Sequence, residues 1–540
     1  MLIAGALSGI QSYLFDVAHE GGRQARRLRA RSLFIQIVAE CAALRIRHAA
    51  GWGPEAVLVS GAGKVLLVGA DLSSAARDAV ISCAGGIAGW LLRNVGSELR
   101  FQLALDAGEG SPVAAYGRVM HQLHAAALQT LPGTAMPHQP DAVWVLEPVV
   151  PPCAICHHRR GELNDPDEDT DEPRLVCRRC FDDRVIGGCV IAANYLVIRD
   201  APRPGKDDID ALGYGVAFAN TLPDDEDIVA AATLREHDDH GRSLPQPPPE
   251  RRLSRRVARH VPALEFLELA EHALGAPLLA VLRMDVDSLG NHIDRALVRA
   301  KDFSSLGELS ADLDGFFSTT LDAELSRPEW NDVYTVFSGG DDLLLVGPWS
   351  LMLGYAGHVQ RLFSRRFPDL TLSAGAALIK PKRPIRYAAF LATERLEDAK
   401  TKGPAPKDQC AALGEVWKWS VHRDVIDGGQ RLAGWVENGL AQRVWLHTLL
   451  ELSEARMGGD AGATARLAYH VARNYPSERD PHPHRAALRQ WADRIIDDFD
   501  SRRSPETRYL PAIVRYALLA TRHRDEERSR HGTRPATEHA

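Results

Sequence analysis

Residues 338–347, SGGDDLLLVG, repeat an earlier stretch of the same chain, SGAGKVLLVG at residues 60–69. Six of the ten positions are identical, but the later copy carries adjacent aspartates, Asp341 and Asp342, where the earlier copy has glycine and lysine. Each copy joins two β-rich runs through a glycine-containing turn, and glycine supplies the positive φ that tight hairpins need. The sequence therefore predicts two similar β-hairpins, of which the second alone carries carboxylates at its turn.

The elements expected around the two hairpins follow the same order. A strand and a long helical region precede each hairpin, and a helix, a strand and a further helix follow it. The spacing also agrees, because Asp341 lies 56 residues after Asp285 in the second copy, and Gly63 lies 57 residues after Ala6 in the first. The repeat predicts an α+β fold with two ferredoxin-like palm modules in one chain.

Further carboxylates end the apolar strand that opens the second copy. Asp285 and Asp287 lie at the end of that strand, which in a ferredoxin-like module runs beside the hairpin that carries Asp341 and Asp342. Converging carboxylates repel one another unless a cation neutralises them. Hard oxygen ligands favour Mg²⁺ or Mn²⁺, and paired ions of this kind transfer phosphoryl or nucleotidyl groups.

Each of these features also has a structural interpretation. The GGDD stretch can be only a turn, and Asp287 can be only the cap of the helix that follows. A purely structural account must explain why the carboxylates occur together in one module and are absent together from the other. We therefore expect metal chemistry in the second module.

Cysteines form a pattern of two CxxC pairs separated by twenty residues. Thiolates two residues apart can bind one tetrahedral zinc, and four of them close the site, so the metal is expected to be structural. A pair of disulfides is the alternative, but it conflicts with the absence of a recognisable secretion signal. The predicted zinc ligands are Cys153, Cys156, Cys177 and Cys180.

Positive charge is concentrated near the N-terminus, although the net charge of the chain is -7. An arginine-rich segment there is dense enough to contact several phosphates of an RNA, and a solvated helix face is the alternative interpretation. The candidate RNA contacts are Arg23, Arg26, Arg27, Arg29 and Arg31.

The length of 540 residues, with 45% hydrophobic and 25% charged residues, predicts several globular domains. No apolar run is long enough to cross a membrane, so a cytoplasmic location is expected. The division expected is a degenerate palm module (1–140), a zinc-binding insertion with a linker (141–260), the catalytic palm module (261–425) and a helical domain with a disordered tail (426–540).

Together these motifs resemble the large polymerase/cyclase subunit of type III CRISPR effector complexes, of the Csm type. The resemblance rests on FSGGDDLLLVGP after MDVDSLG, on a degenerate module that opens LSGIQSYLF and continues RLRARS, and on the four-cysteine insertion between them. It covers most of the chain and thins after about residue 426.

The resemblance implies an antiviral nucleotidyltransferase that makes cyclic oligoadenylate second messengers from ATP when the complex binds target RNA. The implied partners are ATP, the CRISPR RNA with its target, and other type III subunits, with no membrane. Asp285, Asp341 and Asp342 are the implied catalytic ligands of Mg²⁺ or Mn²⁺. The implied nucleotide contacts are Ser338, Gly339, Gly340, Asp287 and Lys400, and for the acceptor ATP Ser8, Gly9 and Gly61.

The sequence departs from many relatives in one respect. An HD-type nuclease domain is expected to be missing, since the sole HD pair, His237 and Asp238, lies in a charged, proline-rich linker. We therefore expect no metal-dependent DNase activity from the chain alone. Two other function classes stay open: an RNA-independent cyclic dinucleotide synthase, and a scaffold subunit without turnover.

Overall fold

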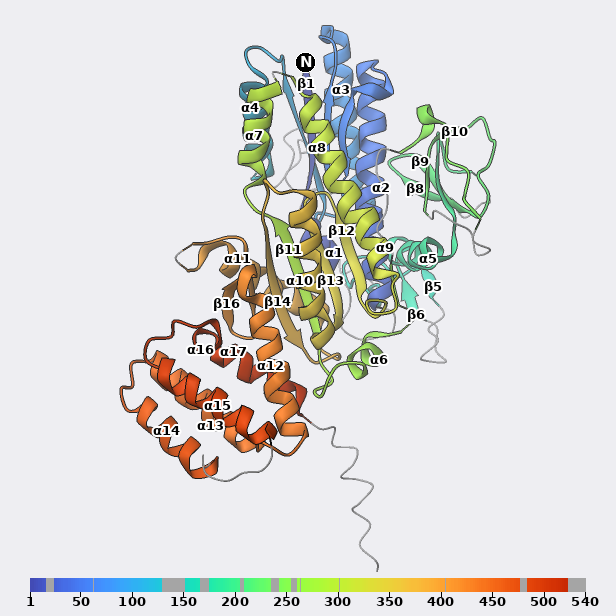
Figure 1. Ribbon diagram of the computed structural model, residues 1–540. Helices are drawn as coiled ribbons and strands as arrows, with labels where there is room; N and C mark the ends of the chain where they lie inside the picture. The colour runs from blue at the N-terminus through green and yellow to red at the C-terminus, as the bar shows by residue number, and fades with distance from the viewer. Residues whose placement is uncertain are drawn as a thin grey trace, which may run out of the picture. The chain divides into compact units, whose positions relative to one another are not determined.

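A computed structural model of the chain (Figure 1) shows a mixed α+β protein built from several sheets and many helices. It divides into two compact units, unit 1 (Met1–Val261 and Ser288–Leu343) and unit 2 (Pro262–Asp287 and Leu344–Ala540). Among the described residues, no helix is long and apolar enough to span a bilayer. The structure describes residues 1–15, 24–61, 63–128, 151–165, 174–203, 208–234, 242–253, 260–262, 264–300, 302–403, 405–475 and 483–522.

Unit 1 contains a four-stranded antiparallel sheet with strand order β2-β3-β1-β4, which is the order of a ferredoxin-like fold. The central strand, β1, pairs with β3 on one side and with β4 on the other. Helices α2 and α3 pack against β2, β3 and β4. The elements are β1 (Leu2–Ser8), α1 (Ile10–Phe15), α2 (Gln24–Ala50), β2 (Val57–Gly61), β3 (Lys64–Val68), α3 (Ser74–Asn94), β4 (Arg100–Asp106) and α4 (Pro112–Ala127).

Helices α7 and α8 of unit 1 pack with α4 beside this sheet. Helix α4 starts at Pro112, whose missing N–H costs nothing at a first turn, and Ser111 accepts a hydrogen bond from the Ala114 amide as its N-cap. Apolar residues of β1, α4, α7 and α8 form one core, and α4 lies beside α7 in Figure 1. The later elements of unit 1 are α7 (Leu289–Ala300), α8 (Ser304–Asp314), a π-helical turn (Gly315–Thr320), α9 (Leu321–Leu325) and β12 (Tyr334–Gly339).

The cysteine-bearing segment and a small separate sheet also belong to unit 1. The small sheet has strand order β10-β7-β9-β8, and its inner residues are apolar. Helix α5 packs against α2, which connects this part of the chain to the first sheet. The elements are β5 (Leu163–Asp165), β6 (Arg174–Val176), α5 (Arg178–Ala192), β7 (Tyr195–Arg199), β8 (Ile209–Ala211), β9 (Tyr214–Ala219) and β10 (Ile228–Thr233).

Unit 2 contains five strands in the order β13-β11-β14-β15-β16, and the boundary with unit 1 falls inside β13. Strand β11 pairs antiparallel with β14 over its whole length, and helices α10 and α11 pack against both strands. The elements are α6 (Phe266–Glu271), β11 (Leu279–Val286), β13 (Asp342–Pro348), α10 (Trp349–Arg366), β14 (Leu372–Ile379), α11 (Ile385–Thr401), β15 (Gln409–Ala412) and β16 (Glu415–Lys418).

The described C-terminal part of unit 2 is helical, as the apolar periodicity predicts. Helix α17 is buried along most of its length and packs against α12 and α13. The helices are α12 (His422–Glu437), α13 (Arg443–Met457), α14 (Ala463–Asn474), α15 (Pro483–Asp498), α16 (Pro505–Arg508) and α17 (Leu510–Ala520). The tail expected to be disordered lies outside the described residues, and the four-domain division stays a prediction.

Candidate functional site

The GGDD turn of the second hairpin is built on a left-handed glycine. Strand β12 ends at Gly339, Gly340 has a φ of 69°, and β13 begins at Asp342. A side chain at Gly340 would strain this backbone, so the sequence needs glycine there. Ser338 is buried, and its Oγ donates a hydrogen bond to the Phe317 carbonyl at 2.6 Å, which anchors the end of β12 to the π-helical turn.

Unit 1 holds a cavity of about 300 Å³ that is lined by both glycine turns. Gly61 and Lys64 come from the turn between β2 and β3, Gly340 and Asp341 come from the GGDD turn, and Ser8 ends β1. The structure therefore brings together residues that the sequence predicts on two separate modules. The rest of the wall is largely apolar and includes Met120, Leu123, Leu289, Ile293, Leu306 and Leu309.

Helix α4 contributes polar groups to this cavity that sequence reasoning missed. Tyr116 and His124 line it together with Met120, at spacings that place them on one face of the helix. Burial raises the pKa of Tyr116, and the nearby carboxylates of Asp294 and Asp341 raise it further. The helical periodicity of these residues was available in the sequence, but nothing in it indicated which face meets the turn.

Ser8 is oriented by a neighbouring strand. Its Oγ accepts a hydrogen bond from the Gln102 amide at 2.8 Å, and both residues line the cavity. Gly9, which follows, has a φ of 81°, and a Cβ there would collide with the Glu98 carbonyl. Gly9 therefore serves the backbone path after β1, and Ser8 is the polar group that this strand presents to the cavity.

In unit 2, the first aspartate of the DVD stretch forms an ion pair. Asp285 near the end of β11 accepts a hydrogen bond from Lys400 Nζ on α11, and both side chains remain partly exposed, at 24% and 21%. The lysine predicted near a triphosphate therefore neutralises a predicted metal ligand. The carboxylate of Asp285 on β11 thus stabilises a positive charge, here that of Lys400.

Asp287 has a different environment, although it lies only two residues away. It is 4% exposed, and its carboxylate accepts hydrogen bonds from Thr371 Oγ1 at 2.9 Å, from Ser373 Oγ at 2.8 Å and from the Asp408 amide at 2.9 Å. These donors come from the start of β14 and from the loop after α11. The geometry makes Asp287 an anchor for that loop, and the alternative of a cap for the next helix has no hydrogen bond among the described residues.

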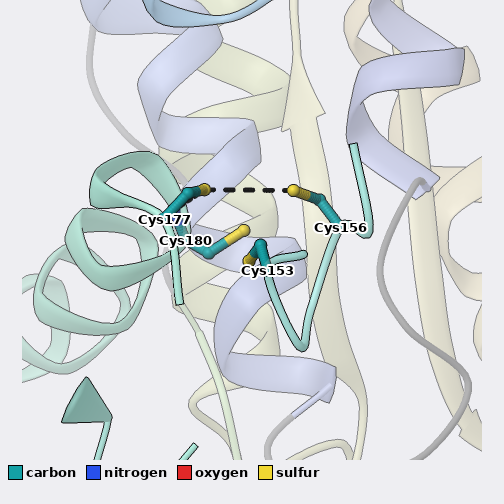
Figure 2. A group of neighbouring side chains, drawn as sticks. All are labelled: Cys153, Cys156, Cys177 and Cys180. Carbon is teal, nitrogen blue, oxygen red and sulfur yellow. Dashed lines mark hydrogen bonds between the residues drawn. The ribbon is translucent and has the colours of Figure 1, made fainter. Parts of the chain in front are cut away.

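The four predicted zinc ligands form a buried cluster in unit 1 (Figure 2). Their Sγ atoms all lie within 4.8 Å of one another, and those of Cys156 and Cys177 are 3.9 Å apart. A tetrahedral zinc with Zn–S bonds of about 2.3 Å places its sulfurs about 3.8 Å apart, so the cluster fits this ion. Cys177 caps α5 and accepts a hydrogen bond from the Cys180 amide, which fixes one CxxC pair at a helix N-terminus.

Guanidinium groups accompany these thiols. Arg31 and Arg159 each approach a cysteine Sγ at 3.9 Å, Arg31 at Cys180 and Arg159 at Cys177. A four-thiolate zinc site carries excess negative charge, which the two cations offset. The CxxC spacing predicts the ligands, but it gives no indication of these two arginines.

The arginine-rich segment on α2 is largely internal. Arg27, Arg29 and Arg31 are all less than 9% exposed. Arg31 donates to Asp183 at 3.0 Å and to the Tyr13 carbonyl at 2.7 Å, and Arg27 forms an ion pair with Asp165 at 3.1 Å. Arg29 lies 5.7 Å from the centre of the Tyr334 ring and Arg26 donates to the Arg184 carbonyl.

The structure thus shows that four of the five arginines join α2 to neighbouring segments of unit 1. Arg23 lies outside the described residues, as do His237 and Asp238 of the HD pair. An RNA contact by this segment stays a prediction.

Two protein families match separate parts of the chain. The second palm domain of Cas10/Cmr2 matches residues 278–411, and domain B of the Csm1 subunit matches residues 1–129. The fold and its turns define a palm-domain protein. The first match contains the GGDD turn. The second contains the turn between β2 and β3, which has no carboxylate and which we call the unarmed turn.

Whole-chain relatives extend this result. The CRISPR system single-strand-specific deoxyribonuclease Cas10/Csm1 (subtype III-A) of Thermococcus onnurineus is 24% identical over 89% of this chain and 66% of its own length. The protein of the same description from Mycobacterium tuberculosis is 22% identical over 96% of this chain and 67% of its own length. The chain is a homologue of the Cas10/Csm1 proteins of type III CRISPR systems.

Solved structures share the fold. A Csm1-Csm4 cassette in complex with cA4 superimposes with a TM-score of 0.69 at 17% identity, over 96% of this chain and 70% of that one. Csm1 of T. onnurineus gives a TM-score of 0.68 at 18% identity, over 97% of this chain and 69% of that one. Other matching cassettes were solved with AMPPNP and with cA3.

Proposed function

We propose that this chain synthesises cyclic oligoadenylates from ATP as the large subunit of a type III CRISPR effector complex, in response to target RNA. The observation that carries the proposal is the cavity of unit 1, because the GGDD turn and the turn without carboxylates both line it. A polymerising reaction needs a donor triphosphate and an acceptor hydroxyl side by side, and a paired turn provides one position for each.

We place the donor nucleotide at the GGDD turn because this turn carries the carboxylates. Asp285, Asp341 and Asp342 offer the hard oxygen ligands that Mg²⁺ or Mn²⁺ prefers, and such an ion, when bound, lowers the pKa of an acceptor 3'-hydroxyl and stabilises charge on the α-phosphate. Lys400, which pairs with Asp285, supplies positive charge suited to a triphosphate. The amides at Gly339 and Gly340 can approach a nucleotide closely because no side chain intervenes.

The acceptor position belongs to the unarmed turn. Ser8 and Gly61 line the cavity beside Gly340 and Asp341, and the largely apolar wall accommodates a flat base. Related Csm1-Csm4 cassettes were solved with ATP, with pppApA and with cA4, and these adenine nucleotides support the proposed chemistry. A related Csm1-Csm4 subcomplex of the type III-A interference complex supports a partner subunit for this chain.

Turnover of labelled ATP tests the proposal. The reconstituted complex is incubated with ATP, Mg²⁺ or Mn²⁺ and matched target RNA, beside an Asp341→Ala, Asp342→Ala variant. Cyclic oligoadenylate that appears with RNA and is lost in the variant supports the proposal. Cyclic dinucleotide without RNA would indicate an autonomous cyclase, and intact ATP under every condition would indicate a scaffold.

A further inference from the structure

The segment between β14 and α11 concentrates positive charge and exposed aromatic rings on one surface of unit 2. Its sequence over residues 380–390 is KPKRPIRYAAF, with four cations and no acidic residue. The first acid after it is Glu394. In a chain with a net charge of -7, this is a local excess of four positive charges.

The local fold presents these groups to solvent. The Arg383 amide donates to the Lys380 carbonyl to close a turn, and Pro384 is the N-cap residue of α11, which begins at Ile385. Ile385 and Ala388 are buried against the sheet, so the opposite face of the helix points outward. The side chains on the outward surface are Lys380, Lys382, Arg383, Arg386, Tyr387 and Phe390, which we call the basic–aromatic surface.

One cation of this surface lies beside an exposed ring. Arg383 lies 5.7 Å from the centre of the Tyr387 ring, four residues further along. Tyr387 is 45% exposed and Phe390 is 59% exposed, and their spacing of three residues places them on one face of the helix. Exposing two large rings side by side is unfavourable in water, and it indicates a surface that contacts another molecule.

We propose that the basic–aromatic surface binds a single-stranded nucleic acid. The cations fit its phosphates, and the exposed rings fit unpaired bases, whose faces a duplex hides. None of the four cations forms an ion pair with another described residue, so they remain available for phosphates. None of its residues lines the nucleotide cavity, and its test needs neither ATP nor metal, so it can fail while the proposed activity holds.

The experiment measures binding of the full chain to a fluorescent 20-nucleotide strand, as oligo-rU or oligo-dT, across a salt series. For single strands, the slope of log K against log salt changes by about 0.7 per phosphate contact. A Lys380→Gln, Lys382→Gln, Arg386→Gln variant should therefore reduce the slope by about 2. A Tyr387→Ala, Phe390→Ala variant should lower affinity at least about tenfold, because each stacked base contributes substantially.

A matched control comes from α10, where Arg361, Arg365 and Arg366 are also exposed, and the ring that Arg366 contacts, Phe367, is buried. Replacing these three with Gln removes the same charge and should leave the slope and affinity nearly unchanged. The proposal is overturned if the control variant loses as much salt slope and affinity as the charge variant. It is equally overturned if a duplex binds as well as a single strand. It is also overturned if the ring variant binds like wild type. Comparing rU with dT shows whether the strand is RNA or DNA.

Discussion

Two aspartates separated by one residue have different roles in this protein. Asp285 remains partly exposed and is paired with Lys400, whereas Asp287 is buried and accepts hydrogen bonds from Thr371, Ser373 and Asp408. Because its oxygens already have donors within unit 2, Asp287 has little capacity left for a metal. We assign Asp287 a structural role in holding the loop after α11, and Asp285 stays the proposed metal ligand of this strand.

Replacing each aspartate with asparagine separates the roles. Asp287→Asn should destabilise the chain by about 1–3 kcal/mol. The NH₂ group of the asparagine would face groups that now donate hydrogen bonds to the carboxylate, so these bonds would be lost. Its affinity for Mn²⁺ should stay near that of wild type, whereas Asp285→Asn should weaken Mn²⁺ binding with a smaller loss of stability. Thermal unfolding and Mn²⁺ titration by calorimetry measure both quantities. An Asp287→Asn chain that melts like wild type but no longer binds Mn²⁺ would contradict this assignment.

A buried histidine, His422, is expected to make the stability of the folded chain depend on pH. Burial lowers the pKa of His422 to about 4, and the ring is held neutral, because Trp417 Nε1 donates to its Nδ1 at 3.0 Å and its Nε2 lies 3.0 Å from the Leu353 carbonyl. Since the unfolded histidine protonates near pH 6.5, this contribution to stability is complete above that pH and is lost as the pH falls toward 4.

Between pH 6.5 and pH 5 the loss should be about 2 kcal/mol, at about 1.4 kcal/mol per pH unit. A His422→Asn variant does not titrate in this range, so its unfolding midpoint should fall less between these pH values than that of wild type. The comparison uses thermal unfolding at both pH values. Equal pH dependence in the two chains would show that His422 is not the group responsible.

At the scale of elements, α2 and α5 are joined by a buried ion pair next to the cysteine cluster. Arg31 contacts Asp183, the Tyr13 carbonyl and a cysteine Sγ, and the carboxylate of Asp183 raises the pKa of Arg31 against the opposing effect of burial. Removing one partner of a buried pair leaves an uncompensated charge, which typically costs about 3–5 kcal/mol.

Arg31→Met should therefore destabilise the chain by about that amount, and it should speed the loss of zinc to a chelator. The matched control is Arg178→Ala, since Arg178 is 65% exposed and pairs with Asp182 on the same helix, where such pairs contribute less than about 1 kcal/mol. Thermal unfolding and zinc release, followed with a colorimetric chelator, give the two readouts. Equal effects of the two substitutions would contradict the structural role of Arg31.

The sequence predicted features that depend on local spacing. The CxxC pairs, the glycine turns and the α+β class all follow from residues near one another in the chain, and the structure shows a cysteine cluster and a hairpin turn at these places. Contacts between distant segments were not predictable in this way. Arg31 meets Asp183 across 152 residues, and Tyr116 reaches the cavity through the packing of α4.

At the scale of the whole molecule, the repeated turn accounts for the proposed reaction. One copy keeps the carboxylates, the other keeps only the glycine backbone, and both line one cavity in unit 1. A second armed turn is unnecessary if the acceptor nucleotide needs orientation alone. This division of labour between donor and acceptor positions is the central claim.

Binding stoichiometry tests that claim most directly. Calorimetric titration of the purified complex with AMPPNP, a non-hydrolysable ATP analogue, should give two bound nucleotides per chain in the presence of Mn²⁺. An Asp341→Ala, Asp342→Ala variant, or wild type with EDTA, should keep one, because the unarmed position needs no metal. A single nucleotide in the wild type, or the loss of both in the variant, would contradict the division of labour between the two turns.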